Sequence, residues 1–132
     1  MARFILISCL SLFSGKDFRL TVIAKNIQVG KGSVVVTIWN DEKTFFKKPL
    51  ISQSQKADKQ ALEFSFELAG GEYAISAYQD INDNKKLDLG IFNIPKEPAG
   101  FGNNYRPKLS APRFRDCAIE LNESRKVEIE LK

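Results

Sequence analysis

The 132-residue chain contains no histidine, and this absence excludes several kinds of catalytic site. Ser-His and Cys-His nucleophile pairs need an imidazole base, and the usual zinc sites need imidazole ligands. Cysteine is almost as scarce, because only Cys9 and Cys117 are present. A single cysteine cannot form an internal disulfide, so loss of Cys9 with a signal peptide would exclude a disulfide-stabilised scaffold. We expect Cys117 to be a small buried hydrophobic group; the alternative is a reactive thiol.

Long hydrophobic runs and blocks of one charge are also missing. The apolar run at residues 4–13 is too short to cross about 30 Å of hydrocarbon. The 20 basic and 16 acidic residues give a net charge of +4 and are interspersed along the chain. No basic stripe is present, and no Gly-rich phosphate loop joins a strand to a helix. We therefore expect a monomer with no nucleic-acid partner and no membrane span in the mature chain.

The N-terminus has the features of an export signal. Arg3 precedes the apolar run, and the small residues Ser14 and Gly15 follow it. We predict a signal peptide at residues 1–15, a mature domain at 16–132, and a periplasmic or secreted location. The alternative is a buried first strand or helix of a cytosolic protein.

Apolar and polar residues alternate with a period of two through most of the chain, which predicts β-strands. The alternation covers residues 18–25, 33–39, 61–68, 73–78, 117–121 and 126–132. Residues 33–39 are apolar on both faces, which is typical of a central strand. Short turns separate the strands, so we predict an all-β fold: one antiparallel β-sandwich of about seven strands with Greek-key connections, immunoglobulin-like or transthyretin-like. Phe45 and Phe46 are expected to begin a short helix or to cover one end of the sandwich.

Residues 80–112 break the alternation. Compact domains rarely contain so long a loop unless it is functional or disordered, and this one is too apolar to remain solvated. We expect it to fold over one end or edge of the sandwich.

The first part of this loop carries side-chain oxygens at a spacing that can surround a cation. Asp80, Asn82, Asn84 and Asp88 would supply side-chain oxygens, and Lys86 its backbone carbonyl. Position 85 lacks the usual turn glycine, and position 91 lacks a bidentate glutamate. We therefore expect a weak calcium site, with a dissociation constant of about 10⁻⁴–10⁻³ M. The alternative is that these side chains only cap turns.

The second part of the loop combines rings and amides that can bind sugars or peptides. The candidate ligand-binding residues are Phe92, Phe101, Asn103, Asn104, Tyr105 and Arg106. The alternative is that the aromatic rings attach the loop to the core. A further basic set is expected to be a solvated surface rather than an anion-binding patch: Lys47, Lys48, Lys56, Lys59, Arg113 and Arg115.

These loop motifs also carry a family resemblance. The run Gly71–Ile75 leading into residues 80–88, Gly90–Glu97, and Gly100-Phe101-Gly102-Asn103-Asn104 resemble the bacterial family DUF2141. The similarity covers about residues 18–131. It implies a small, exported, β-rich protein and implies no particular activity.

We therefore expect a non-enzymatic exported module, binding or structural, that uses the 80–106 loop to hold an envelope or extracellular ligand. No cofactor is required, although Ca²⁺ could stabilise the loop. The alternatives are a hydrolase that uses Asp80 and Asp88 as a carboxylate pair, and a purely structural envelope protein.

Overall fold

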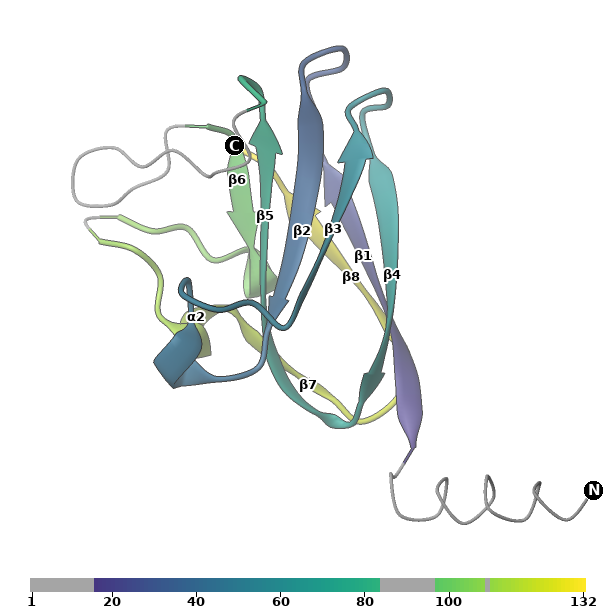
Figure 1. Ribbon diagram of the computed structural model, residues 1–132, viewed down its shortest axis with the longest axis vertical. Coiled ribbons are helices and arrows are strands. Elements are labelled where there is room, and N and C mark those ends of the chain that lie inside the picture. The colour runs from purple at the N-terminus through teal and green to yellow at the C-terminus, as the bar shows by residue number, and fades with distance from the viewer. Residues whose placement is uncertain (1–15, 84–96, 109) are drawn as a thin grey trace, which may run out of the picture.

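Two packed β-sheets form the protein in the computed structural model, which describes residues 16–83, 97–108 and 110–132 (Figure 1). The strands are β1 (Asp17–Lys25), β2 (Ser33–Trp39), β3 (Ile51–Lys56), β4 (Leu62–Ala69), β5 (Gly71–Asp80), β6 (Ala99–Phe101), β7 (Ala118–Leu121) and β8 (Arg125–Glu130). Within the described ranges, three short helical turns accompany them: η1 (Glu42–Thr44), η3 (Gly102–Asn104) and α2 (Phe114–Cys117).

The strand order confirms the predicted sandwich. One sheet has three strands in the order β4-β1-β8. The other has the order β3-β2-β5-β6, with β7 also paired to β5. Strand β2 is central, as its two apolar faces predicted. One pair departs from the antiparallel pattern, since β1 and β8 are parallel. Strand β8 reaches β1 from β7, which lies in the other sheet, and a crossover of this kind permits a parallel pair.

The main hydrophobic core lies between the two sheets, and the alternation of the sequence accounts for it. Leu20, Val22 and Ala24 point inward from β1, and every second residue of β4 is buried against them, including Phe64 and Phe66. Burial of this kind contributes about 25 cal/mol to the free energy of unfolding for each Å² of apolar surface removed from water.

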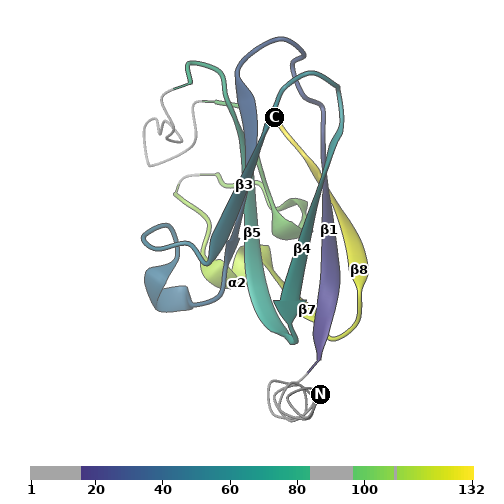
Figure 2. The same cartoon turned by 45° about the vertical axis from the view of Figure 1, so that its right-hand side comes forward.

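A second hydrophobic cluster lies on the outer face of the five-stranded sheet. It contains Trp39 and Ala74 from the strands, and Ala99, Phe101, Phe114 and Cys117 from the C-terminal half of the chain. Half-buried Phe45, Tyr78, Tyr105 and Ala118 pack against it. The segments 40–50 and 102–117 lie on this side of the sheet, while β1, β4 and β8 lie on the other (Figure 2). Phe45 therefore covers the outer face of this sheet rather than one end of the sandwich, and the short helical turn η1 ends before it, at Thr44.

Cys117 is buried, as predicted, but not on the predicted face. The alternation placed it beside Ile119 and Leu121. Instead it ends the helical turn α2 and belongs to the outer cluster, whereas Ile119 and Leu121 face the main core. A helical turn changes the direction of successive side chains by about 100° rather than 180°, so the period of two does not extend back to residue 117.

Residues 1–15 lie outside the described part of the chain, so the signal peptide remains a prediction. Within the described ranges, none of the helices has the length and apolar character needed to cross a membrane.

Candidate functional site

The long loop after β5 leaves the sandwich and returns at one place. The Gln79 N–H donates to the Pro98 carbonyl at 2.9 Å, and the Ile81 N–H donates to a Glu97 carboxylate oxygen at 2.9 Å. Strand β6 then pairs antiparallel with β5, with Tyr78 opposite Ala99. The two ends of the loop are therefore held together where β5 ends.

Only part of the predicted cation site falls within the described residues. Asp80 is 1% exposed at the last position of β5, and Asn82 is exposed in the turn that follows. Asn84, Lys86 and Asp88 lie outside the described residues. The distance between the Asp80 and Asp88 carboxyl groups is therefore not described either. Across the described ranges, no three Cys, Asp or Glu residues group closely enough to hold a metal ion. The calcium site and the carboxylate pair both remain predictions.

A close backbone contact fixes the place of Asp80. Gly32, in the turn between β1 and β2, has a φ of +65°, and a β-carbon there would lie 1.9 Å from the Asp80 carbonyl oxygen. The buried Gln79 side chain donates to the carbonyls of Gln28 and Lys31 at 2.7 and 2.6 Å. The entrance to the loop is thus bound to the β1–β2 turn.

The described members of the aromatic and amide set make contacts within the protein. Phe101 is 1% exposed, and half-buried Tyr105 packs on the same cluster. The Asn103 amide donates to the carbonyls of Asp116 and Ala118 at 3.3 and 2.9 Å. These contacts give both residues a structural role. For Phe101 this was the alternative interpretation of the sequence, whereas the role of Asn103 was not predicted. Phe92 lies outside the described residues, and ligand binding by the set stays untested.

Asn104 and Arg106 cover the outer edge of β8. The Asn104 side-chain oxygen accepts from the Glu130 N–H at 3.1 Å. The Arg106 guanidinium donates to the Ala99 carbonyl at 3.0 Å and also to the Glu130 carbonyl. Beside them, Ala99 and Lys132 exchange two backbone hydrogen bonds of 3.0 Å. Segment 99–106 therefore joins the two sheets along this edge.

The opposite edge of the sandwich is joined in a similar way. Gln53 and Gln55 of β3 donate their side-chain amides to the Ser65 and Glu63 carbonyls of β4, both at 2.7 Å. The carbonyl groups of an edge strand are in this way satisfied by side chains of the other sheet.

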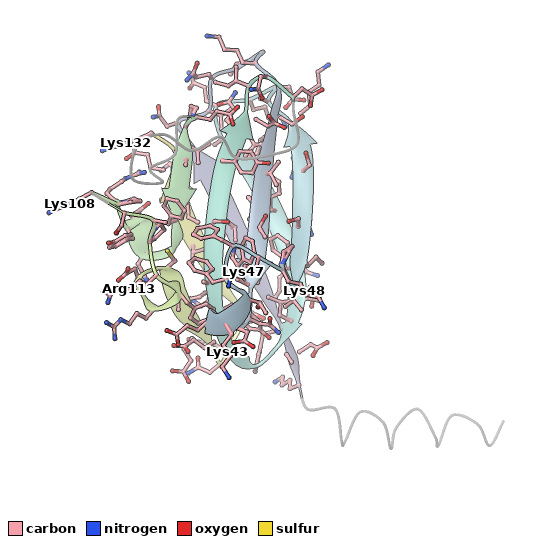
Figure 3. The ribbon with its side chains drawn as sticks, turned by 60° about the vertical axis from the view of Figure 1, so that its left-hand side comes forward. Lys43, Lys47, Lys48, Lys108, Arg113 and Lys132 are labelled. Atoms are coloured by element: carbon pink, nitrogen blue, oxygen red, sulfur yellow. The ribbon has the colours of Figure 1, made fainter. Side chains whose placement is uncertain are left out.

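The outer cluster is surrounded by basic side chains, which we call the basic face: Lys43, Lys47, Lys48, Lys108 and Arg113. In Figure 3 the first three lie around the turn η1, and the last two lie along the adjoining edge. Arg113 approaches Asp116 at 3.4 Å. Within the described ranges, no carboxylate oxygen lies within 4.0 Å of the four lysine ammonium groups.

The net positive charge of the chain is unevenly distributed over its segments. Segments 40–50 and 102–118 together contain seven basic and three acidic residues, a net charge of +4. The whole chain also has a net charge of +4, so the remaining residues are neutral in sum. Basic and acidic residues are interspersed along the chain, but the fold brings two segments with an excess of basic residues to the same side of one sheet. Lys47, Lys48 and Arg113 are part of the set expected from the sequence to be a solvated surface, and a charge count by segment would have indicated the asymmetry.

The same face contains exposed apolar side chains. Phe46 and Leu50 are 39% and 45% exposed. The Phe46 ring stacks on Phe45, with centroids 4.1 Å apart, and meets the Trp39 ring edge-on at 5.5 Å. A hollow of about 430 Å³ lies next to them, lined by Asn40, Asp41, Thr44, Lys48, Pro49 and Leu50.

Backbone contacts hold this segment in place. The Thr44 carbonyl accepts from the N–H groups of both Lys47 and Lys48 at 2.8 Å, and the Leu50 N–H donates to the Ile38 carbonyl at 2.9 Å. Phe46 has a φ of +63°, in the left-handed region that bulky side chains rarely adopt. Strained residues of this kind are enriched at functional sites.

The Cys117 thiol lacks the properties of a nucleophile. Burial raises its pKa to about 12, and the negative charge of Asp116 acts in the same direction. The thiol is therefore protonated at neutral pH, and the thiolate is the reactive form.

Comparison with known proteins gave one result. Residues 22–130 match the model of a family described as "Uncharacterized protein conserved in bacteria (DUF2141)". No match was found among curated proteins or among solved structures.

Proposed function

The chain belongs to the DUF2141 family, and from this premise we propose that it is a non-enzymatic, exported binding module that holds an anionic partner on its basic face. The observation that supports the proposal most strongly is the concentration of the chain's net positive charge in the two segments that cover the outer cluster. Clustered charge of one sign attracts a partner of opposite charge and accelerates its association.

The basic face is also attached to a fixed base. Residues 40–50 and 102–118 both pack on the outer cluster through Phe45 and Phe114, whose rings meet edge-on at 5.8 Å. Because the backbone that carries the lysines is already ordered, less conformational entropy is lost on binding.

The proposal retains part of the 80–106 loop and adds a second segment. Residues 102–106 lead into Lys108, and Arg106 holds this part of the loop in place by donating to the Ala99 and Glu130 carbonyls. Residues 40–50 supply three further lysines. The described aromatic and amide side chains of the loop support the face from beneath. A non-enzymatic role accords with the missing imidazole, since general acid–base catalysis uses histidine most often.

Binding to a soluble polyanion tests the proposal. We expect the chain to bind dextran sulfate at low ionic strength and not to bind neutral dextran. The chain should release dextran sulfate as the salt concentration increases. Replacing Lys43, Lys47 and Lys48 by Gln should weaken binding about tenfold, because three charges leave one face.

The matched control removes the same number of charges elsewhere. Lys31, Lys56 and Lys59 are exposed and lie near the turns at the other end of β2 and β3. Their replacement by Gln should weaken binding less than about twofold. Equal losses in the two triple variants, or no binding by the parent chain, would contradict the proposal and favour a purely structural role.

A further inference from the structure

We infer that the anionic partner is the surface of a lipid bilayer, and that residues 46–50 enter its headgroup region. The inference rests on the proposed function and makes it specific. It depends on how apolar and basic side chains are combined in this one segment.

Two exposed apolar side chains, Phe46 and Leu50, lie close together in residues 46–50. Among the described residues, five large hydrophobic side chains are exposed: Val29, Phe46, Leu50, Ile51 and Ile81. Ile51 does not belong to this pair, because it lies opposite Ile38 in β2 and therefore points to the side of the sheet that faces β4. A soluble partner with many charges would not need apolar contacts gathered there, whereas the interfacial region of a bilayer accepts both kinds of group.

Basic side chains accompany these apolar groups. Lys47 and Lys48 lie within the segment, and Lys43 precedes it on the same turn (Figure 3). Long lysine side chains can keep their ammonium groups among lipid phosphates while their methylene groups lie along apolar surface. Lysines close to an anionic leaflet are attracted to it, and this attraction falls off within a Debye length.

The shape of the segment favours a bilayer over a folded partner. Residues 40–50 project from the outer face of the sheet (Figure 2). A projecting apolar segment needs a complementary recess in a folded protein, whereas lipid headgroups can rearrange around it. Pro49 and the two hydrogen bonds to the Thr44 carbonyl keep the projection rigid.

Vesicle co-sedimentation tests the inference directly. Residues 1–15 contain an apolar run that would itself associate with lipid, so the protein is compared as the chain beginning at Lys16. Every described strand and both hydrophobic clusters lie within that chain. We expect it to bind vesicles of phosphatidylglycerol and phosphatidylcholine, and not vesicles of phosphatidylcholine alone.

The variant pair separates apolar contact from charge. Replacing Leu50 by Ser should weaken vesicle binding about tenfold while leaving dextran sulfate binding within about twofold. Val29→Ser is the control, since Val29 is 53% exposed in the turn at the other end of β2. It should bind vesicles as the parent does. Thermal melting of each variant verifies that it is folded.

Each remaining outcome decides between the two proposals. Binding of dextran sulfate or poly-glutamate without binding of anionic vesicles would overturn the bilayer inference and leave the proposed function in place, with a soluble acidic partner. Vesicle binding that the Leu50 substitution does not change would overturn the insertion of residues 46–50. Failure to bind any of these polyanions would overturn both proposals.

Discussion

At the scale of single residues, two glycines allow the chain to approach itself closely. A β-carbon on Gly102 would lie 2.0 Å from the Cys117 carbonyl oxygen, and one on Gly100 would lie 2.4 Å from a methyl group of Ile129. Nearby, Asn103 adopts a φ of +63°, which asparagine tolerates better than most residues. The Gly-Phe-Gly-Asn-Asn run therefore has a conformational explanation that needs no ligand.

Gly102→Ala should destabilise the protein strongly. The contact at 2.0 Å is with backbone, which can move only by shifting α2 or η3, so we expect a loss of at least about 2 kcal/mol in the free energy of unfolding. Gly71→Ala is the control, because the nearest atoms to its β-carbon lie at an ordinary 3.7 Å. Urea denaturation measures both. A Gly102→Ala protein as stable as the Gly71→Ala protein would show that the two backbones are farther apart.

The Cys117 thiol should resist alkylation in the folded protein. A pKa raised from 9.0 to about 12 lowers the thiolate fraction at pH 8 by about a thousandfold. Because the protonated thiol is favoured by folding, its stabilising contribution is complete below pH 9 and is lost as the pH rises toward 12. Iodoacetamide labelling of the chain beginning at Lys16, with and without denaturant, measures the difference. Rapid labelling of the folded protein would place Cys117 at the surface.

At the scale of elements, segment 99–106 acts as a connector between the sheets. Its three-residue strand β6 is too short to be stable alone, and the contacts of Asn104 and Arg106 with Glu130 attach it to β8. Side chains thus replace a neighbouring strand at the edge of the three-stranded sheet.

Arg106→Ala should weaken the attachment of segment 99–106 to β8 and lower the free energy of unfolding. Two backbone carbonyls would lose a charged donor, at a cost of about 1.5–3 kcal/mol for each unsatisfied partner that stays buried. Arg106→Lys should recover only part of the loss, since an ammonium group cannot reproduce the guanidinium fork. Lys108→Ala removes an exposed charge from the same segment and serves as the control. Thermal denaturation compares the three, and equal melting temperatures for Arg106→Ala and Lys108→Ala would contradict the connecting role.

At the scale of the whole molecule, different parts of the chain form the scaffold and the charged surface. The main core and the two connected edges form the scaffold, and the segments that cover the outer cluster carry the net charge. The predicted calcium loop begins elsewhere, at Asp80, where β5 ends close to the β1–β2 turn.

Calcium should stabilise the protein if the predicted loop site forms. At a free concentration tenfold above the dissociation constant, a single site adds about 1.4 kcal/mol to the free energy of unfolding. The melting temperature should therefore rise in millimolar Ca²⁺, and Mg²⁺ should have a smaller effect. Asn82→Ala should reduce the rise, because it removes one of the predicted side-chain oxygens, and melting in chelator verifies that the variant is folded. The same melting temperature in chelator and in 10 mM Ca²⁺ would leave only the turn-capping role.

The sequence alone determined the sandwich, because strand formation depends on local alternation. Leu20, Val22 and Ala24, or the alternate residues of β4, can face the core only as strands, and β2 with two apolar faces can only be central. The sequence did not reveal β3 and β6. In residues 51–56 every residue after the first is polar, so no alternation is visible. The three residues at 99–101 are too few to show a period.

The tertiary structure decided which residues can meet a partner. The sequence grouped Phe101, Asn103, Asn104 and Arg106 by their chemistry, but their hydrogen bonds and burial depend on β8 and α2, which lie far along the chain. The basic face, likewise, joins residues 40–50 to residues 102–118 only because both cover Trp39 and Ala74 on the outside of one sheet. Local periodicity fixes secondary structure, whereas a surface is made by contacts between distant segments, and no local pattern encodes those.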